Sequence, residues 1–559
     1  KLIEGEGDAK QKTTQFNYNW AGNLCMVREG LEGPAQSPPL ATRIWEIGYD
    51  AVQRPHWAMD PMGNMFVNTY ADQSFNVETF EILGELEDTS TDPTSSTVSF
   101  VRRQFEYDDQ GRVHTVSEEF FDPETQATLS DGLSVFEINY ASNSDLDFVE
   151  DDNGHTLHYS YDTAGRLQSL QDGLGNNTIY GYDDNSNVTS LISQEKYADP
   201  TPDAIFITTF EYDNLNRISR MIDNDNKVTR YGFNSRGRLA RLEDARGYTT
   251  EYQYDVRNRL RSVAREHDRP AGDYSNADYT SVVTQYNYDE NSRLTQVLDN
   301  NNRATAYAYD ALNRPVSVTY ADSTALSVVY NVLGDVASIT DPNGSVVQNT
   351  LFDNLGRLRA RAITPGIGVS DQTTFETFQY DGLSRLVRAE NNSAVVTRKY
   401  DSLSNVIRET LNGKPTTFTH DGVGNPLTVG YPGGRTITST YDVLDRLSSL
   451  AEGVNPLASF HYVGPGGRTQ WEDFANNTRN VFGYKDGMNN DDPLGRMRSA
   501  TTIFDPTGLN TTLDQRWFDW DETGNRTTHN DFARGILRTF QYDSLGRVAQ
   551  SVLENGPDE

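Results

Sequence analysis

The chain has 559 residues, of which 81 are Asp or Glu and 48 are Lys or Arg, so its formal net charge is −33. This excess of negative charge repels nucleic acid at long range, so nucleic acid is excluded as an expected partner. Hydrophobic residues make up only 36% of the chain, below the roughly 45–50% of an ordinary globular domain, so a large filled core is not expected.

The first hundred residues contain degenerate copies of one short phrase. Residues 18–24 read Tyr-Asn-Trp-Ala-Gly-Asn-Leu, residues 49–55 read Tyr-Asp-Ala-Val-Gln-Arg-Pro, and residues 60–64 read Asp-Pro-Met-Gly-Asn. An acidic, Ser/Thr-rich segment from Glu85 to Ser99 follows and is predicted to be a loop. The sequence therefore predicts a degenerate N-terminal part over residues 1–106 and one continuous regular array over residues 107–559.

From Tyr107 onward an aromatic-Asp-x-x-Gly/Asn-Arg-Leu phrase returns about every 21 residues. A fixed period of this size indicates a repeat architecture in which each unit packs against its neighbours. The copies begin at Tyr107, Tyr140, Tyr161, Tyr182, Tyr212, Phe233, Tyr254, Tyr288, Tyr309, Tyr330, Phe352, Tyr380, Tyr400, His420, Tyr441, Tyr462, Tyr484, Trp520 and Tyr542.

Each copy is predicted to be a hairpin turn. Asp after the aromatic residue accepts backbone N–H groups, and Gly or Asn three residues later tolerates a positive φ. Asn216, Asn258 and Asn313 occupy this position in some copies, as expected for a left-handed residue. The Arg that follows is interpreted as structural, because its planar fork binds carboxylates and carbonyls bidentately.

A second turn falls in the middle of each unit, as at 172–176, 244–247 and 341–344. The segments beside it alternate aromatic and small or polar residues, for example 252–254 and 307–309, which places the aromatic side chains on one face of a strand. The predicted fold is therefore all-β: antiparallel hairpins in a long ribbon, wound into a shell or elongated barrel.

The longer units carry insertions at 194–206, 266–281 and 363–375. All three fall at the second turn and leave the Tyr-Asp turn at its usual length. Because insertions in repeat proteins map to one side, we expect the Tyr-Asp edge to pack against a neighbouring turn.

These units resemble the YD repeats of RHS proteins, a family that includes bacterial polymorphic toxins, the cocoon components of insecticidal Tc toxins and the teneurin receptors. Residues 161–167, 352–358 and 542–548 carry the resemblance most clearly. It implies a ribbon of hairpins wound as a spiral into a hollow shell, with a C-terminal toxin or signalling segment enclosed or attached.

One feature of bacterial relatives has no counterpart here. Their repeat cores typically end in a segment with paired Asp-Pro-x-Gly phrases and aspartate-dependent self-cleavage, whereas this chain runs to Glu559 after another repeat. The phrase at 505–508 is interpreted as a degenerate second turn. Since Lys1 is not an initiator Met, we expect the chain to be a portion of something longer.

No catalytic, cofactor-binding or metal-binding residue is predicted. Cys25 is the one cysteine, and no apolar run of 18 residues predicts a membrane span. His420 occupies the aromatic position of its repeat, and His155 and His158 lie three apart, on opposite faces of a strand. The acidic pairs 151–152 and 491–492 and the Gly-rich phrases 431–435 and 464–468 are interpreted as turns. The acidic phrases around 145 and 223 look like fragments of a calcium loop but lack its Gly at position 6 and Glu at position 12, so weak surface calcium binding stays an open alternative.

The function expected from these features is a non-catalytic shell scaffold of a secreted or cell-surface bacterial protein. It would enclose or display a C-terminal effector that lies outside this chain. One alternative is an extracellular adhesive or structural protein that binds carbohydrate or neighbouring cells through its exposed loops. Another is an enzyme with a glycosidase-like carboxylate pair in a groove.

Overall fold

The computed structural model describes residues 2–4, 11–32, 43–71, 74–87, 97–196, 203–266, 280–484, 492, 494–505, 510–543 and 545–554. These residues form 45 strands in one antiparallel sheet, and no helix occurs among them. The predicted all-β class of antiparallel hairpins is confirmed.

The strands of the first half run as follows: β1 Leu2–Glu4, β2 Gln11–Tyr18, β3 Leu24–Glu32, β4 Arg43–Tyr49, β5 Pro55–Met59, β6 Met65–Tyr70, β7 Val77–Gly84, β8 Val98–Tyr107, β9 Val113–Asp122, β10 Ala127–Tyr140, β11 Leu146–Glu150, β12 Thr156–Tyr161, β13 Leu167–Asp172, β14 Asn177–Tyr182, β15 Val188–Glu195, β16 Ala204–Tyr212, β17 Ile218–Ile222, β18 Val228–Phe233, β19 Leu239–Glu243, β20 Thr249–Tyr254, β21 Leu260–Glu266, β22 Ser281–Tyr288 and β23 Leu294–Leu298.

The strands of the second half continue in the same manner: β24 Ala304–Tyr309, β25 Pro315–Thr319, β26 Ala325–Tyr330, β27 Val336–Thr340, β28 Val346–Phe352, β29 Leu358–Thr364, β30 Phe375–Tyr380, β31 Leu386–Asn391, β32 Val395–Tyr400, β33 Val406–Leu411, β34 Lys414–His420, β35 Pro426–Gly430, β36 Thr436–Tyr441, β37 Leu447–Glu452, β38 Asn455–Val463, β39 Arg468–Phe474, β40 Thr478–Gly483, β41 Ser499–Phe504, β42 Thr511–Trp520, β43 Arg526–Asp531, β44 Ile536–Tyr542 and β45 Val548–Glu554.

The register of the sheet shifts by one residue at the aromatic position of the repeat. Between β14 and β15, Gly181 lies opposite Ser190 but Tyr182 lies opposite Val188. A β-bulge of this kind bends and twists the strand next to the turn. The same shift occurs at Tyr161, Tyr212, Phe233, Tyr254, Tyr288, Tyr309 and Tyr330.

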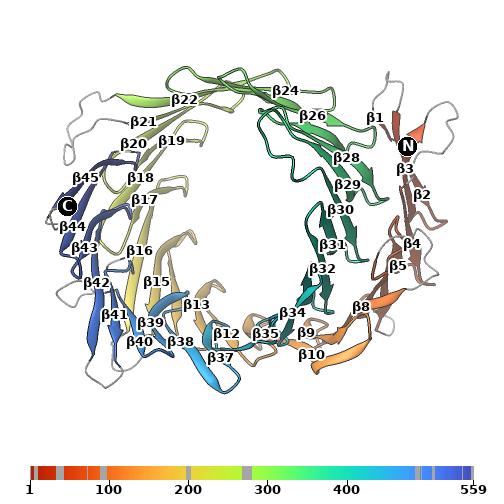
Figure 1. Cartoon of the computed structure of the whole chain (residues 1–559), viewed down its shortest axis with the longest axis horizontal. Coiled ribbons are helices and arrows are strands. Elements are labelled where there is room, and N and C mark those ends of the chain that lie inside the picture. Colours follow the sequence, from red (N-terminus) through yellow and green to blue (C-terminus); the bar gives the residue numbers. More distant parts are fainter. Residues whose placement is uncertain are drawn as a thin grey trace. The chain divides into compact units, whose positions relative to one another are not determined.

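The chain divides into two compact units. Unit 1 contains Lys1–Asn139, Glu150–Gly154 and Thr305–Ile437, and unit 2 contains Tyr140–Val149, His155–Ala304 and Thr438–Glu559. Each unit thus combines an early and a late stretch of the ribbon. In Figure 1 the early stretch of unit 1 is red to orange and its late stretch runs from green to cyan.

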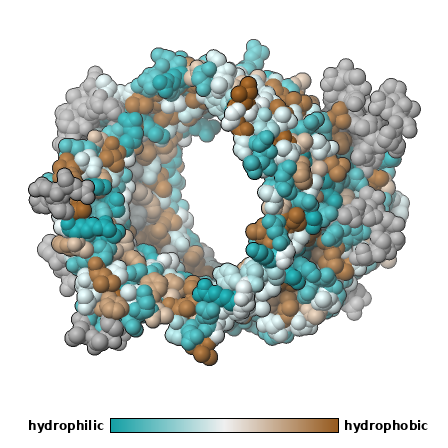
Figure 2. Space-filling model, in the orientation of Figure 1, coloured by the Kyte–Doolittle hydropathy of each residue, from teal (hydrophilic) through white to brown (hydrophobic). Residues whose placement is uncertain are grey.

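Most side chains are only half-buried, and the residues that are fully buried lie mainly at one edge of the ribbon. Phe100 and Val101 lie at the start of β8, and Phe120 and Phe121 lie at the end of β9, beside second turns. The visible face is mainly hydrophilic, with hydrophobic residues scattered over it (Figure 2). The core of unit 1 therefore follows an edge of the ribbon rather than filling the space between two sheets.

The predicted insertions fall at the second-turn edge, but the strands extend further into them than expected. Glu195 pairs with Ala204, and Glu266 pairs with Ser281, while residues 197–202 and 267–279 lie outside the described residues. The predicted loop at 85–99 is corrected at its end, because β8 begins at Val98. Residues 88–96 and 506–509 also lie outside the described part.

Candidate functional site

The turn at residues 161–167 shows the geometry of the Tyr-Asp turns. Asp162 Oδ1 accepts the N–H groups of Ala164 (2.9 Å) and Arg166 (3.0 Å), and Asp162 Oδ2 accepts Arg166 Nε (2.7 Å). Gly165 donates its N–H to the Asp162 carbonyl at 3.0 Å and has a φ of 76°. The predicted turn with a left-handed residue is confirmed.

Where the repeat lacks Gly, the left-handed position holds Asn, as predicted, or another polar residue. Ser186, Ser292 and Ser384 have φ angles of 66°, 67° and 62° there, although the sequence predicted Gly or Asn. The φ angles of Asn216, Asn258 and Asn313 are 58°, 62° and 63°. The second turns use the same geometry, since Asp172 Oδ1 accepts the N–H groups of Leu174 (3.0 Å) and Asn176 (2.9 Å). The two edges of the ribbon therefore differ in their neighbours rather than in their backbone.

The arginine of each turn ties its repeat to the next one. The Arg166 guanidinium lies 4.5 Å from the centroid of the Tyr182 ring, and Nη1 donates to the Asp183 carbonyl (2.9 Å) and to Ser186 Oγ (3.2 Å). Tyr182 in turn donates its hydroxyl to the Leu167 carbonyl at 2.6 Å. The arginines are thus structural, as predicted, and join the carboxylate of one turn to the ring and carbonyl of the next.

The same relay recurs along the ribbon. An Arg stacks on the next aromatic ring and donates to the next turn carbonyl in the pairs Arg259 with Tyr288 and Asp289, Arg357 with Tyr380 and Asp381, and Arg385 with Tyr400 and Asp401.

Within unit 1, the late Tyr-Asp turns dock on the early second turns. We call this line of contact, in either unit, the seam. Gly382 donates its N–H to the Glu85 carbonyl (2.9 Å), and Ser402 donates its N–H to the Phe121 carbonyl (2.9 Å). Ser402 Oγ also donates to the Glu119 carbonyl (2.7 Å) and accepts the Phe121 N–H (3.0 Å). Backbone hydrogen bonds therefore fix the register of the two stretches.

Ion pairs reinforce the seam of unit 1. Arg43 and Asp335 pair at 3.0 Å with side chains only 10% and 16% exposed, and Lys399 pairs with Glu124. Partial burial weakens solvent screening, so the Arg43 pair contributes more than an exposed pair would.

Unit 2 repeats this arrangement. Gly464 donates its N–H to the Lys196 carbonyl at 3.3 Å, and Arg468 pairs with Glu195. Lys227 Nζ lies 3.3 Å from a carboxylate oxygen of Glu522. The expectation that the Tyr-Asp edge packs against a neighbouring turn is confirmed for the late stretches, and the neighbour is a second turn of the early stretch.

The early Tyr-Asp turns differ from the docked ones in exposure. Leu215 and Val256 in the early turns of unit 2 are 71% and 87% exposed, whereas Asp381 and Ser402 in the docked turns of unit 1 are 2% and 1% exposed. Docking thus buries Asp381 and Ser402 in unit 1, whereas the early turns of unit 2 expose Leu215 and Val256.

The turn carboxylates fall into two electrostatic classes. The N–H of Arg166 and then its guanidinium lower the pKa of Asp162, because both stabilise the carboxylate. Burial raises the pKa of Asp401 to about 6, against the hydrogen bonds from Asn405. Asn405 stands at the position that holds Arg in the turn of Asp162, so no guanidinium from its own turn neutralises Asp401.

Two family descriptions match the sequence. Teneurin YD-shell matches residues 268–384, and RHS Repeat matches residues 233–273. Residues 233–384 thus match RHS/YD repeats. No curated protein sequence matches the chain.

Solved structures share the fold of this chain. A Tc holotoxin pore of Photorhabdus luminescens aligns with a TM-score of 0.63 and 13% identity, over 97% of this chain and 32% of that chain. The crystal structure of TcdB2-TccC3-TEV gives 0.62 and 13% over 97% and 33%, and TcdB2-TccC3 without its hypervariable C-terminal region gives 0.54 and 11% over 98% and 34%. This chain spans about a third of the length of those chains.

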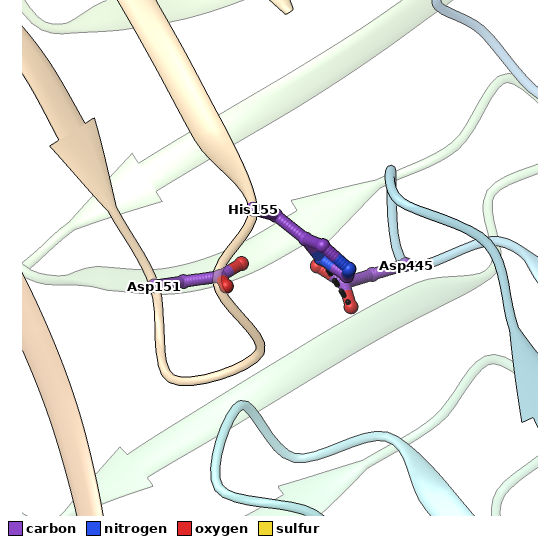
Figure 3. Close-up of side chains that lie close together, drawn as sticks. All are labelled: Asp151, His155 and Asp445. Carbon is purple, nitrogen blue, oxygen red and sulfur yellow. Dashed lines mark ion pairs between the residues drawn. The ribbon is translucent and has the colours of Figure 1, made fainter. Parts of the chain in front are cut away.

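The histidines singled out from the sequence have separate surroundings. His155 Nδ1 lies 3.3 Å from Asp445 Oδ1 within unit 2 (Figure 3), and His158 lies against Phe148 with ring centroids 5.2 Å apart. Asp151, also drawn in Figure 3, belongs to unit 1. His420 stacks on Phe418 at 6.5 Å, and burial lowers its pKa. The aromatic role predicted for His420 is confirmed.

The Gly-rich phrases are turns, as predicted. Tyr431 donates its N–H to the Arg435 carbonyl at 2.8 Å, and Gly434 has a φ of 84°. Residues 464–467 form the turn between β38 and β39.

The part of the chain that the structure describes contains no helix that could span a membrane.

A cavity of about 480 Å³ lies at the seam of unit 1. Its walls include Phe100, Asp122, Asp381, Arg385, Lys399 and Tyr400. Arg385 pairs with Asp381 at 2.7 Å within one turn, and Lys399 pairs with Glu124 across the seam.

One turn was misassigned from the sequence. The repeat that begins at Tyr484 reaches its turn carboxylate only at Asp492, whose N–H donates to the Tyr484 carbonyl at 2.6 Å. Asp492 is fully buried and pairs with Arg496 (2.9 Å) and Arg498 (2.6 Å). An insertion therefore also occurs at the Tyr-Asp edge, contrary to the expectation. The sequence Asp-Pro-Leu-Gly-Arg at 492–496 matches the Asp-x-x-Gly-Arg part of the repeat phrase and could have identified this turn.

Proposed function

We propose that this chain is a wall segment of a YD shell, a non-catalytic scaffold that encloses or displays an effector segment of the same polypeptide. One observation carries the proposal: in both units, late Tyr-Asp turns dock on early second turns through backbone hydrogen bonds and ion pairs. Partners joined across the seams by hydrogen bonds or ion pairs are separated by between 268 and 297 residues. A ribbon that docks on itself at a nearly constant separation builds a continuous wall.

The interactions that stabilise the chain are also those expected of a thin wall. Stability comes from relays between neighbouring repeats and from the seams, and most side chains on the sheet faces are half-buried. Such a structure can surround another segment without a filled core of its own. The shared fold with Tc toxin structures supports this use, since those structures are of a holotoxin pore and of a TcdB2-TccC3 assembly.

The proposal also covers where the scaffold works, what residues 1–106 form, and which sites the chain lacks. The scaffold works outside the cell or at its surface, in keeping with the teneurin and Tc toxin names of its relatives. Residues 1–106 are degenerate N-terminal repeats of the same wall, because the turns at Asp50 and Asp60 use the hydrogen bonds of the regular turns. The absence of catalytic and cofactor sites stays a prediction, as does the carbohydrate-binding alternative.

Protease protection in the native polypeptide tests the proposal. The polypeptide that contains this chain is digested with a non-specific protease under native conditions, and the fragments are identified by mass spectrometry. An enclosed effector survives in the wild type and is cut when the seam is opened by Gly382→Glu. A displayed effector is present but is cut in both proteins. A native polypeptide with no non-repeat segment attached to its repeats would contradict the proposal.

A matched control separates seam opening from general damage. No heavy atom lies within 4 Å of a Cβ atom added to Gly433, which occupies a second turn of the late stretch of unit 1. The Gly433→Glu variant adds the same charge and bulk away from the seam. Its fragment pattern is expected to match the wild type.

A further inference from the structure

Two carboxylates are held inside the seam of unit 1 without an arginine in their own turns. Asp401 is fully buried, and its oxygens accept the backbone N–H (2.7 Å) and the side-chain amide (3.2 Å) of Asn405. The next residue, Ser402, makes the three hydrogen bonds to the 119–121 segment described above. Any change in the charge of Asp401 therefore acts directly on a docked turn.

The charged groups around this turn are few. Arg385, from the preceding Tyr-Asp turn, donates to the Asp401 carbonyl at 2.9 Å and is itself paired with Asp381. Lys399, two residues before Asp401, pairs with Glu124 across the seam. Both cations pair with other carboxylates. The positive charge of Arg385 and the hydrogen bonds from Asn405 still stabilise the Asp401 carboxylate, but burial outweighs them.

Asp152 occupies a comparable place further along the same seam. Its Oδ1 accepts the Val135 N–H at 2.8 Å, and its Oδ2 lies 1.8 Å from the position of a Cβ atom added to Gly422. The docked turn at Gly422 therefore packs directly on this carboxylate. Ser134 Oγ holds the two stretches together here by donating to the Gly422 carbonyl at 2.6 Å.

The groups that act on Asp152 share its sign. Burial raises the pKa of Asp152, and the negative charges of Asp131, Asp421 and Asp151 raise it further. Asp421 belongs to the docked turn itself and accepts the Asn153 side-chain amide at 3.0 Å. Repulsion between Asp152 and Asp421 thus pushes the late stretch away from the early stretch whenever both are ionised.

We propose that the seam of unit 1 is a pH-sensitive clasp that is tighter in mildly acidic solution than at neutral pH. The sign follows from linkage. Asp401 binds its proton more tightly in the folded state, with a pKa raised from 3.8 to about 6, so its destabilising effect is complete above pH 6 and declines as the pH falls. The pKa of Asp152 is also raised, so its ionisation destabilises the seam in the same pH direction.

This inference deepens the proposed function and rests on it for its biological meaning. A wall whose seam tightens in acid retains its content there and yields more readily near neutral pH. The physical claim, however, concerns only the docking of two stretches within unit 1. Its test therefore needs no effector, and its failure would leave the protease-protection result unaffected.

Hydrogen exchange of the seam amides in the full chain tests the clasp. The amides of Gly382, Ser402 and Phe121 form the seam, and their protection is compared at pH 5.5 and 7.5 after correction for the intrinsic pH dependence of exchange. From Asp401 alone we expect about fourfold greater protection at pH 5.5, because a carboxyl with a pKa of about 6 is largely protonated at pH 5.5 and ionised at pH 7.5. The Asp401→Asn variant should raise the protection at pH 7.5 and remove most of the difference.

Two other variants complete the experiment. Asp152→Asn should also raise protection at pH 7.5, at a different point of the seam, and remains informative if Asp401→Asn does not fold. Asp108→Asn is the matched control, because the backbone N–H of Arg112 and its guanidinium lower the pKa of Asp108 outside the seam; it should leave the pH difference unchanged. Equal protection of the wild-type amides at both pH values, or greater protection at pH 7.5, would overturn the clasp, as would an unchanged pH difference in both seam variants.

Discussion

Gly84 and Gly382, far apart in the sequence, lie so close in unit 1 that a Cβ atom on Gly382 would come within 2.9 Å of the Gly84 Cα atom. The same Cβ atom would lie 2.5 Å from Asn64 Oδ1 and 3.0 Å from the Phe100 ring. The Gly382 N–H donates to the Glu85 carbonyl beside this contact. The absence of a side chain on both residues is therefore what allows the two stretches to reach hydrogen-bonding distance.

Replacing Gly382 by alanine should weaken the seam. The methyl group meets backbone and buried side chains, and overpacking of this kind costs about 1–3 kcal/mol. The φ of Gly382 lies outside the left-handed region. A loss of stability would therefore come from the close contact with Gly84 and not from backbone strain. Urea unfolding of the chain measures the change in the free energy of unfolding.

Gly433→Ala is the control for this substitution. Its Cβ atom would meet nothing within 4 Å, and its φ is not positive. We expect no loss of stability, and a gain of up to about 1 kcal/mol from the less flexible unfolded chain. Equal losses in the two variants would show that the contact between the glycines does not matter.

Tyr182→Phe should destabilise unit 2 by about 0.5–1.5 kcal/mol. The substitution removes the hydrogen bond from the hydroxyl to the Leu167 carbonyl (2.6 Å) and keeps the ring that stacks on Arg166. Tyr180→Phe, in the same strand, removes a hydroxyl with no hydrogen bond to a described residue and should cost less. Thermal unfolding of both variants checks the difference, and a larger loss for Tyr180→Phe would count against the relay.

The Glu195–Arg468 pair should behave as a buried ion pair. Glu195 is 9% exposed, so Arg468→Met should cost about 3 kcal/mol by leaving its carboxylate without this cation. Adding Glu195→Leu should recover part of that loss, because the carboxylate that faced Arg468 is then gone, whereas the hydrogen bond from Arg468 to the Gly495 carbonyl stays lost. Urea unfolding of the wild type, both single variants and the double variant measures this recovery.

The exposed pair of Arg479 and Asp473 supplies the comparison. Their side chains are 51% and 35% exposed, and Arg479→Met should change stability by less than about 1 kcal/mol. If Arg468→Met cost no more than Arg479→Met, the seam pair of unit 2 would have no special role.

Stability should be greatest at about pH 5. Arginine-paired turn carboxylates such as Asp162 have a lowered pKa, so their contribution is present above about pH 4 and is lost as the pH falls further. Asp401, with a pKa raised to about 6, acts in the opposite sense and costs stability as the pH rises through 6. Thermal midpoints between pH 3 and 8 test this profile, which a midpoint that rises steadily to pH 8 would contradict.

Local chemistry explains why the turns could be predicted from the sequence. Asp162, Gly165 and Arg166 make contacts within five residues of one another. Gly and Asn indicated the left-handed position in many copies, whereas Ser186, Ser292 and Ser384 take the same conformation without that signal. The strand direction and the side of most insertions then follow from the alternation of two turns in each repeat.

Docking could not be predicted from these local rules. Whether Gly382 contacts Gly84 or another second turn depends on the number of residues after which the ribbon docks on itself. The repeat phrase does not specify that number. A signal was nevertheless present, because small residues follow the Asp in three docked turns, at Gly382, Ser402 and Gly422. The turn at Asp492 was missed since seven residues separate it from Tyr484, which hid the phrase behind an insertion.

Zero-length crosslinking of the native chain tests the self-docked wall most directly. A carbodiimide joins a lysine to a carboxylate only when the two are in contact, and each seam offers one such pair without mutation: Lys399 with Glu124 in unit 1 and Lys227 with Glu522 in unit 2. Mass spectrometry of the monomeric, folded protein should recover both crosslinked peptides. Recovery of neither, with these lysines joined to other carboxylates instead, would contradict the docking of late turns on early turns.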